Sequence, residues 1–184
     1  MKTSFKVIIT FILFLTSIYI VLFPGKALRR EIKVLGTGEA SVYEGDLELK
    51  LFLKVIDVSG LDEIKARYLL INHGEETLTY NMEWDAFYEK VYKNNILIMT
   101  TNPRIVLSSL EIYTIEPGGN ETNWYSQSYR LNETGRYYIS GVWKYITNLE
   151  SAWGGKEPFK MAQIETSKIP VRVKYGLRVP FRPG

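Results

Sequence analysis

The chain of 184 residues contains one histidine and no cysteine, which limits the chemistry that it can perform. Without cysteine it cannot form a disulfide, a thiolate zinc site, an iron–sulfur site or a cysteine nucleophile. With His73 alone, one chain cannot supply two histidine ligands to a metal, and a general base has a single histidine candidate. His73 lies in the turn sequence Asn72-His73-Gly74, without a recognisable nucleophile or orienting partner. We therefore interpret His73 as an exposed turn residue.

Three pairs of acidic residues are the remaining candidates for acid–base or metal chemistry. The pairs at positions 62–63 and 75–76 are sequence neighbours, which point to opposite faces of a strand. Glu83 and Asp85 would share a face on which a cation can bind. The sequence contains no Asp-x-Asp-x-Asp-Gly calcium loop, no glycine-rich phosphate loop and no Gly-x-Ser-x-Gly elbow. A carboxylate-dependent or metal-dependent hydrolase is thus only the third hypothesis for function, and no cofactor is expected.

The C-terminal segment has the alternation of a strand with one basic face. Residues 169–179 place Ile, Val, Tyr and Leu on one face and Arg172, Lys174 and Arg178 on the other. Residues 156–184 carry seven basic and two acidic residues, whereas residues 34–155 carry ten basic and seventeen acidic residues.

This basic stripe has two interpretations. It suits an anionic partner such as lipid headgroups, an acidic glycan or the acidic face of another subunit. Alternatively, it is an edge strand whose Lys and Arg side chains prevent pairing with other chains. Nucleic acid is not expected, because the stripe has no interleaved aromatic residues and the domain is expected outside the cytoplasm.

Two tryptophans are further candidates for contact with a partner. Trp124 alternates with Tyr125 and Tyr129, so it faces solvent if those tyrosines face the core. Trp153 lies in an expected loop next to two glycines, where it contacts either a partner or the loop itself. Exposed rings of this kind stack on sugars or anchor a protein contact. Most other aromatic residues are expected in the core or in strand pairs, among them Trp84, Tyr137 and Trp143.

From about residue 31 onward, apolar residues recur with the period of two that is typical of β-strands. Residues 46–58 place four leucines and a valine on one face of a strand. Turn sequences rich in Asn and Gly separate the segments, and no sustained helical period is present. These features predict an all-β fold, an antiparallel β-sandwich. The other expected strands are residues 64–71, 78–84, 96–100, 105–115, 122–131 and 137–146.

The segment Leu131-Asn132-Glu133-Thr134-Gly135-Arg136-Tyr137 has the Leu, Gly and Tyr spacing of a tyrosine corner. In this motif the Tyr hydroxyl bonds back to nearby backbone at the edge of a sandwich. We therefore expect such a hydrogen bond from Tyr137.

Four segments carry a family resemblance: the strand end Asn72-His73-Gly74-Glu75-Glu76, the aromatic strand Phe87-Tyr88-Glu89-Lys90-Val91-Tyr92, the turn Glu116-Pro117-Gly118-Gly119 and the return strand Gly135-Arg136-Tyr137. Through them, residues 68–143 resemble the immunoglobulin-like domain of the intracellular proteinase inhibitor type and related archaeal and bacterial envelope proteins. Two features of that family, a tyrosine-aspartate-phenylalanine strand and a later tryptophan-serine segment, do not stand here as such. The resemblance implies an immunoglobulin-like β-sandwich and makes protease inhibition, by an exposed loop, the second hypothesis for function.

Residues 7–23 form an uncharged apolar run with basic residues on both sides. At roughly 1.5 Å per residue the run covers about 26 Å, slightly less than the roughly 30 Å hydrocarbon core of a bilayer. It ends in Ile-Val-Leu-Phe and so offers no small-residue cleavage site. We expect a transmembrane signal anchor that stays on the chain. The alternative is a cleaved signal peptide, which would give a secreted protein.

The expected organisation is a signal anchor at residues 1–25, a juxtamembrane linker at 26–38 and a β-sandwich domain at 39–184. The balance of basic residues on the two sides of the anchor does not decide its orientation. Glycosylation sequons at Asn120 and Asn132 favour an exported domain, and a short N-terminal anchor most simply displays one.

We therefore expect a single-pass protein of the cell membrane whose domain is extracytoplasmic. It would act as a non-catalytic binding or structural module of the cell envelope. Its expected partners are membrane lipid, through residues 7–23, and an envelope protein or polysaccharide.

Overall fold

The computed structural model describes residues 28–82, 87–101, 111–125, 127–147, 158 and 160–177. Within these ranges the chain is all-β, and its strands form two sheets. None of the described residues belongs to a helix that is long and apolar enough to cross a membrane. The expected membrane span, residues 7–23, lies outside the described ranges.

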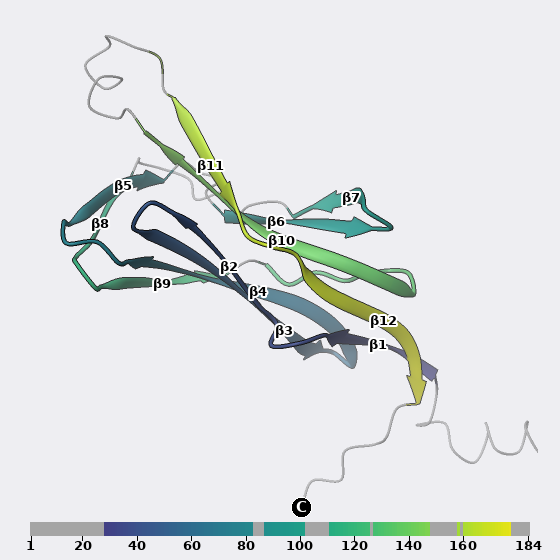
Figure 1. The fold of residues 1–184 in the computed structure, drawn as a ribbon. Coiled ribbons are helices and arrows are strands. Elements are labelled where there is room, and N and C mark those ends of the chain that lie inside the picture. The colour runs from purple at the N-terminus through teal and green to yellow at the C-terminus, as the bar shows by residue number, and fades with distance from the viewer. Residues whose placement is uncertain are drawn as a thin grey trace, which may run out of the picture.

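The described strands form sheet A, with eight members, and sheet B, with four (Figure 1). All their pairings are antiparallel, which confirms the expected antiparallel all-β fold. Sheet A consists of β1 (Leu28–Val34), β5 (Leu78–Met82), β6 (Phe87–Lys93), β7 (Ile96–Thr100), β8 (Glu111–Ile115), β10 (Gly135–Ile146), β11 (Met161–Glu165) and β12 (Ile169–Leu177). Sheet B consists of β2 (Glu39–Glu44), β3 (Leu47–Val58), β4 (Leu61–Asn72) and β9 (Asn120–Tyr125).

Sheet B is a meander of β2, β3 and β4, with β9 added beside β4. The strands β3 and β4 pair along their full lengths. Leu49, Leu51 and Leu53 of β3 are buried, as the period of two predicts. The turn between β3 and β4 contains Ser59 and Gly60, both with positive φ, which matches the twist of a two-residue hairpin.

The long strand β10 is the centre of sheet A. On one side it pairs with β6 and, near its C-terminal end, with β5; on the other side it pairs with β12 and then with β11. The strand β1 extends the sheet beyond β12, so β12 lies between β1 and β10. The interpretation of the basic C-terminal segment as an edge strand is therefore wrong. The alternation of this segment correctly predicts that Ile169, Val171 and Val173 are buried, whereas Tyr175 at the same parity is 67% exposed. Alternation within one strand contains no information about the neighbouring strands.

The strand β1 lies within residues 26–38, which the sequence pattern assigned to a linker. It pairs with β12 from Leu28 to Val34. Ile32 of β1 is 6% exposed and belongs to the core. Arg30 stands at the same parity as Leu28 and Ile32 and interrupts the apolar side of the strand pattern. The folded part therefore begins before residue 39. After β1 the chain crosses to sheet B, where the backbone N–H of Leu53 donates to the carbonyl of Gly38 over 2.8 Å.

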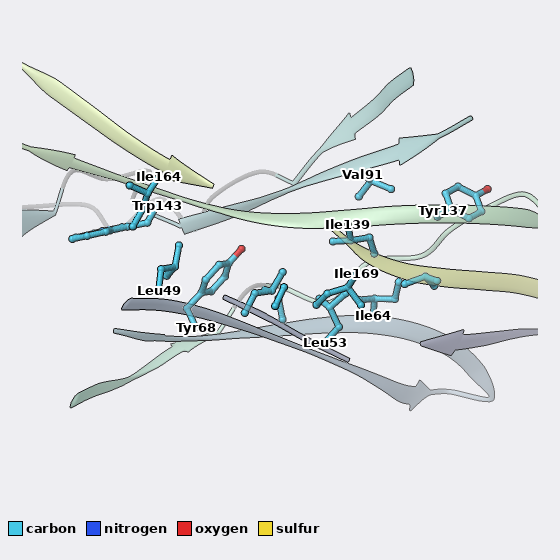
Figure 2. Close-up of a cluster of buried hydrophobic side chains, with 14 of the residues drawn as sticks. Leu49, Leu53, Ile64, Tyr68, Val91, Tyr137, Ile139, Trp143, Ile164 and Ile169 are labelled. Atoms are coloured by element: carbon cyan, nitrogen blue, oxygen red, sulfur yellow. The ribbon is translucent and has the colours of Figure 1, made fainter. Parts of the chain in front are cut away.

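The core lies between the two sheets (Figure 2). Full burial of a Leu, Ile or Val side chain contributes about 1.5–3 kcal/mol. Side chains from sheet B meet those of sheet A across this layer. The labelled members are Leu49, Leu53, Ile64 and Tyr68 from sheet B and Val91, Tyr137, Ile139, Trp143 and Ile169 from sheet A, with Ile164 at the margin.

Gly141 of β10 makes room for a tyrosine of the opposite sheet. A Cβ atom at this position would lie 2.7 Å from Cε1 of Tyr68 and 3.2 Å from both Cδ atoms of Leu51. The hydroxyl of Tyr68 donates a 2.5 Å hydrogen bond to Glu89, and both residues are fully buried. Burial, together with the neighbouring carboxylate of Glu89, raises the pKa of Tyr68 well above its usual value, so this hydroxyl remains a donor.

The expected hydrogen bond of the tyrosine corner is confirmed. The hydroxyl of Tyr137, a residue that is 2% exposed, donates to the backbone carbonyl of Glu133 over 2.8 Å. Gly135 between them has a φ of 143°, a conformation that favours glycine. Arg30 of β1 donates to the carbonyls of Leu131 and Asn132, which ties β1 to the same turn.

Candidate anion-binding site

Arg172, in the middle of β12, has a basic residue opposite it on both sides. It pairs with Lys33 of β1 and with Arg136 of β10. All three residues are exposed, and residues opposite one another in adjacent strands share a face of the sheet. They form a continuous row of cations across three strands, which we call the basic row. Within the part of the chain that the structure describes, none of the three has an ion-pair partner.

The basic row differs from three other cations of sheet A, which form ion pairs with glutamates. Lys174, in the next row, lies opposite Glu31, with Nζ 3.4 Å from Oε2. Lys90 and Lys93 form ion pairs with glutamates as well. Because like charges directly opposite one another destabilise a sheet, three unbalanced cations in a row oppose folding. A bound anion would relieve this repulsion.

A second row, which we call the apolar row, lies beside the basic row on the same face. Pro170, Tyr138, Tyr92 and Leu97 lie opposite one another across β12, β10, β6 and β7. Pro170 and Leu97 are exposed, and the two tyrosines are half-buried. The ammonium group of Lys168 lies 3.7 Å from the centroid of the Tyr92 ring, which adds a cation to the row.

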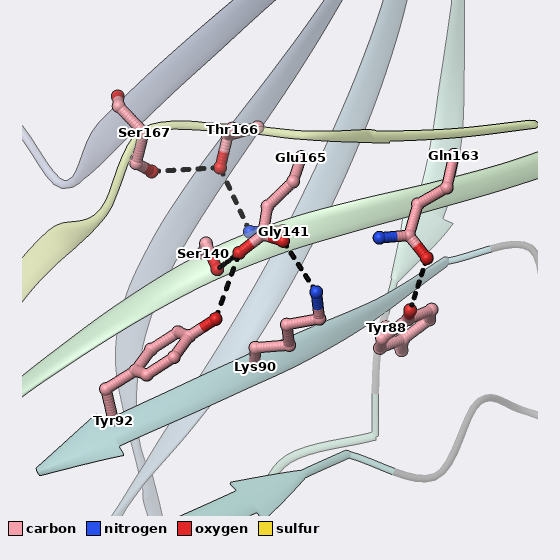
Figure 3. A network of polar contacts seen from close by, with 9 residues as sticks. All are labelled: Tyr88, Lys90, Tyr92, Ser140, Gly141, Gln163, Glu165, Thr166 and Ser167. Carbon is pink, nitrogen blue, oxygen red and sulfur yellow. Dashed lines mark hydrogen bonds and ion pairs between the residues drawn. The ribbon is translucent and has the colours of Figure 1, made fainter. Parts of the chain in front are cut away.

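Further along this face, the carboxylate of Glu165 accepts hydrogen bonds from three side chains (Figure 3). The donors are Lys90 at 2.6 Å, Ser140 at 2.6 Å and Tyr92 at 3.2 Å. Burial raises the pKa of Glu165, but these hydrogen bonds lower it by more, so the pKa lies below its usual value. Ser140 is fully buried and donates its proton to Glu165, so it is not an accessible nucleophile.

This network fixes the junction between β11 and β12. The backbone N–H of Gly141 donates to Oγ1 of Thr166 (Figure 3). The N–H of Thr166 donates in turn to the carbonyl of Gly141. At the other end, Tyr88 donates to Gln163 over 3.1 Å. The contacts hold the C-terminal strands against β10 and thereby position Arg172 next to Arg136.

His73 has an interaction partner that the sequence did not reveal. Its Nε2 lies 2.7 Å from Oε2 of Glu48, a residue that is 2% exposed. Lys50 lies 3.4 Å from the other carboxylate oxygen, and the ring of Tyr43 is 5.6 Å from the His73 ring. Burial raises the pKa of Glu48, but hydrogen bonds from His73, Tyr43 and Lys50 lower it by more, so the pKa lies below its usual value. His73 itself is exposed, as the turn sequence predicts.

Two adjacent acidic residues have structural partners on the two faces of β4. Asp62 accepts a 2.9 Å hydrogen bond from the backbone N–H of Ile32 and so connects β4 to β1. Glu63 accepts hydrogen bonds from Ser128 at 2.5 Å and from Arg130 at 2.7 Å. Among the described residues, no group of three His, Asp or Glu side chains is arranged to hold a metal ion.

The structure describes three of the remaining candidate residues, Trp124, Asn120 and Asn132. Trp124 lies in β9, opposite Tyr68 of β4 in the backbone register. Asn120, at the start of β9, and Asn132 are both exposed. Trp153, Arg178, Glu83 and Asp85 lie outside the described residues.

No protein-family model and no curated protein matches the chain. The basic row and the apolar row are the features on which we base the proposed function. Sequence alternation identifies Arg172 and Lys174 as exposed cations, but Lys33 and Arg136 join Arg172 only through strand pairing.

Proposed function

We propose that the protein is a membrane-anchored, non-catalytic binding module of the cell envelope, whose extracytoplasmic β-domain binds an anionic partner. The basic row is the observation that supports this proposal. Lys33, Arg136 and Arg172 are exposed, adjacent and without acidic partners among the described residues. A sheet holds them at fixed positions, so little conformational entropy of the backbone is lost on binding.

The fold supports the same proposal. Two antiparallel sheets around a shared core, with a tyrosine corner before β10, are compatible with an immunoglobulin-like sandwich. Such domains provide a rigid scaffold for binding surfaces. Residues 7–23 would fix the domain at the membrane, because β1 begins only five residues after Phe23.

Binding of a polyanion tests the proposal. The full chain is reconstituted in nanodiscs of neutral lipid and titrated with heparin as the anionic probe. The variant Lys33→Gln, Arg136→Gln, Arg172→Gln should bind at least about tenfold more weakly, since one charge-assisted hydrogen bond contributes about 1.5–3 kcal/mol.

The matched control removes three positive charges elsewhere. Lys54, Lys65 and Lys160 lie outside the basic row, so Lys54→Gln, Lys65→Gln, Lys160→Gln should bind like the wild type. Equal weakening by the two triple variants would show that net charge, and not the basic row, controls binding. Absence of binding by the wild type would refute the proposal.

A further inference from the structure

The geometry points to the membrane itself as the anionic partner of the basic row. The outer face of sheet A, which carries the basic row and the apolar row and points away from sheet B, lies on the phosphate headgroups of the bilayer in which the chain is anchored. This inference rests on the proposed function and specifies its ligand. Its basis is the combination of the basic row, the apolar row and the exposed strand β7 on one side of the domain.

The two adjacent rows have the chemistry of a surface that binds at the bilayer interface. Cations of the basic row would pair with headgroup phosphates, each contributing about 1 kcal/mol near an anionic surface. Tyr138 and Tyr92 are half-buried residues with an apolar ring and a polar hydroxyl, which suits the boundary between headgroups and acyl chains. A soluble polyanion would satisfy the cations but not the apolar row.

The strand β7 adds an apolar edge to this surface. Ile96, Leu97 and Ile98 are 67%, 48% and 50% exposed. A register shift between Val91 and Tyr92 separates the pairs of Leu97 and Met99, and Ile98 has no residue opposite it. An exposed apolar edge strand without Lys or Pro promotes association with other chains. Contact with the bilayer interface would cover these side chains without a second protein.

The connection between the apolar run at residues 7–23 and strand β1 has a length that allows sheet A to lie along the membrane surface. The five residues from Phe23 to Leu28 span at most about 17 Å when extended. Lys33 lies five residues further along β1, about 17 Å from Leu28. With residues 7–23 across the bilayer, the start of β1 is held near the headgroups. Sheet A can then lie along the surface without unfolding.

The absence of cysteine allows a direct test in the full chain. One label is placed at Thr100→Cys, an exposed position of β7 opposite Lys90. The control label is placed at Ser41→Cys, an exposed position of β2 opposite Lys50 in sheet B. Each variant is reconstituted in nanodiscs with neutral lipid or with added anionic lipid. Quenching of the fluorescent label by nitroxide-labelled headgroups reports which face lies on the membrane.

The inference predicts strong quenching at position 100 in anionic nanodiscs and weak quenching at position 41. Adding Lys33→Gln, Arg136→Gln, Arg172→Gln should shift the equilibrium between domains whose sheet A contacts the membrane and domains that do not contact it. The ratio of the two populations should fall by about 100-fold, at roughly fivefold per cation. The variant Leu97→Ser, Ile98→Ser should reduce quenching at position 100 while leaving heparin binding unchanged. Circular dichroism of each variant establishes that the β-structure is retained.

Two other outcomes would overturn the inference in distinguishable ways. Equal quenching at the two positions, with heparin binding that still depends on the basic row, would mean that the partner is a free polyanion such as an acidic polysaccharide. Equal quenching without such heparin binding would refute the proposed function as well.

Discussion

Glu48 is a buried carboxylate on the outward side of β3, and it is covered by residues of three segments. Tyr43 lies opposite it in β2, Lys50 lies two residues along β3, and His73 follows β4. An ionised carboxylate in such a place is costly unless hydrogen bonds replace its water. The three donors do so, and the pKa of Glu48 is lowered in spite of its burial.

This cluster predicts how stability depends on pH. Because the pKa of Glu48 is lower in the folded state than its usual value of about 4.3, the folded state binds fewer protons. The stability contributed by Glu48 is therefore complete at neutral pH and is lost as the pH falls from about 4.3 through the folded pKa. In Glu48→Gln this contribution is missing, so the difference in Tm between wild type and variant should shrink on acidification.

Thermal unfolding of the full chain between pH 7 and pH 3, followed by circular dichroism, measures this difference. Glu39→Gln, at an exposed position of β2, is the matched control and should keep the wild-type profile. A constant difference between wild type and Glu48→Gln at all pH values would contradict the prediction.

Among the elements, the strands that the sequence predicts are those with a clear alternation of apolar and polar residues. The long strands β3, β4 and β10 were all expected, and so was the inward face of β12 at Val171 and Val173. The strands β1, β2 and β11 were not expected. Their short segments carry many charged or exposed residues, which obscure the period of two.

The candidate anion-binding site is predictable from the sequence only in part, because it combines residues from strands that are far apart in the chain. Alternation within one strand identifies Arg172 and Lys174 as exposed cations. Lys33 and Arg136 join Arg172 through the order β1, β12, β10, whose members are far apart in sequence. Non-local pairing of this kind leaves no local pattern, so the basic and apolar rows require the three-dimensional register.

The contact between Gly141 and Tyr68 makes β10 sensitive to one added methyl group. In Gly141→Ala the new Cβ would lie 2.7 Å from a buried tyrosine ring that is itself hydrogen-bonded to Glu89. The ring is fully buried and held by this hydrogen bond, so we expect a loss of about 1–3 kcal/mol in the free energy of unfolding. Denaturant titration of the full chain measures this loss.

Gly176→Ala is the matched control for this substitution. Its Cβ would lie 2.8 Å from the carboxylate end of Glu31, which is flexible and partly exposed. The side chain can move aside, so the change should stay within about 0.5 kcal/mol. Equal effects at the two glycines would mean that close packing between the sheets does not limit β10.

For the whole molecule, the net charge of +3 conceals a separation of charges. The segment 156–184 has an excess of basic residues, and the segment 34–155 an excess of acidic ones. Folding places Arg172 beside Lys33, which precedes both segments, and beside Arg136 of the acidic segment. Positive charge is thereby concentrated on the outer face of sheet A. A domain with this distribution would be oriented by a negatively charged surface.

The proposed anchor predicts how the full chain behaves in membranes. With residues 7–23 across the bilayer, the protein should remain in the membrane fraction after extraction with alkaline carbonate or with high salt, because apolar insertion is insensitive to both. Leu13→Asp with Leu15→Asp places two charges near the centre of the run, each costing about 2.5–3.5 kcal/mol. This variant should be released by carbonate.

The Leu13→Asp, Leu15→Asp variant also separates two modes of membrane contact, insertion of residues 7–23 and binding of sheet A to the headgroups. If the outer face of sheet A binds headgroups, the Leu13→Asp, Leu15→Asp variant should still sediment with anionic vesicles at low salt and be released by high salt, since screening weakens surface charge interactions. Lys2→Asp, outside the apolar run, is the control and should remain resistant to carbonate. Release of the wild type by carbonate would show that residues 7–23 do not anchor the chain, and the domain would then depend on its charged face alone.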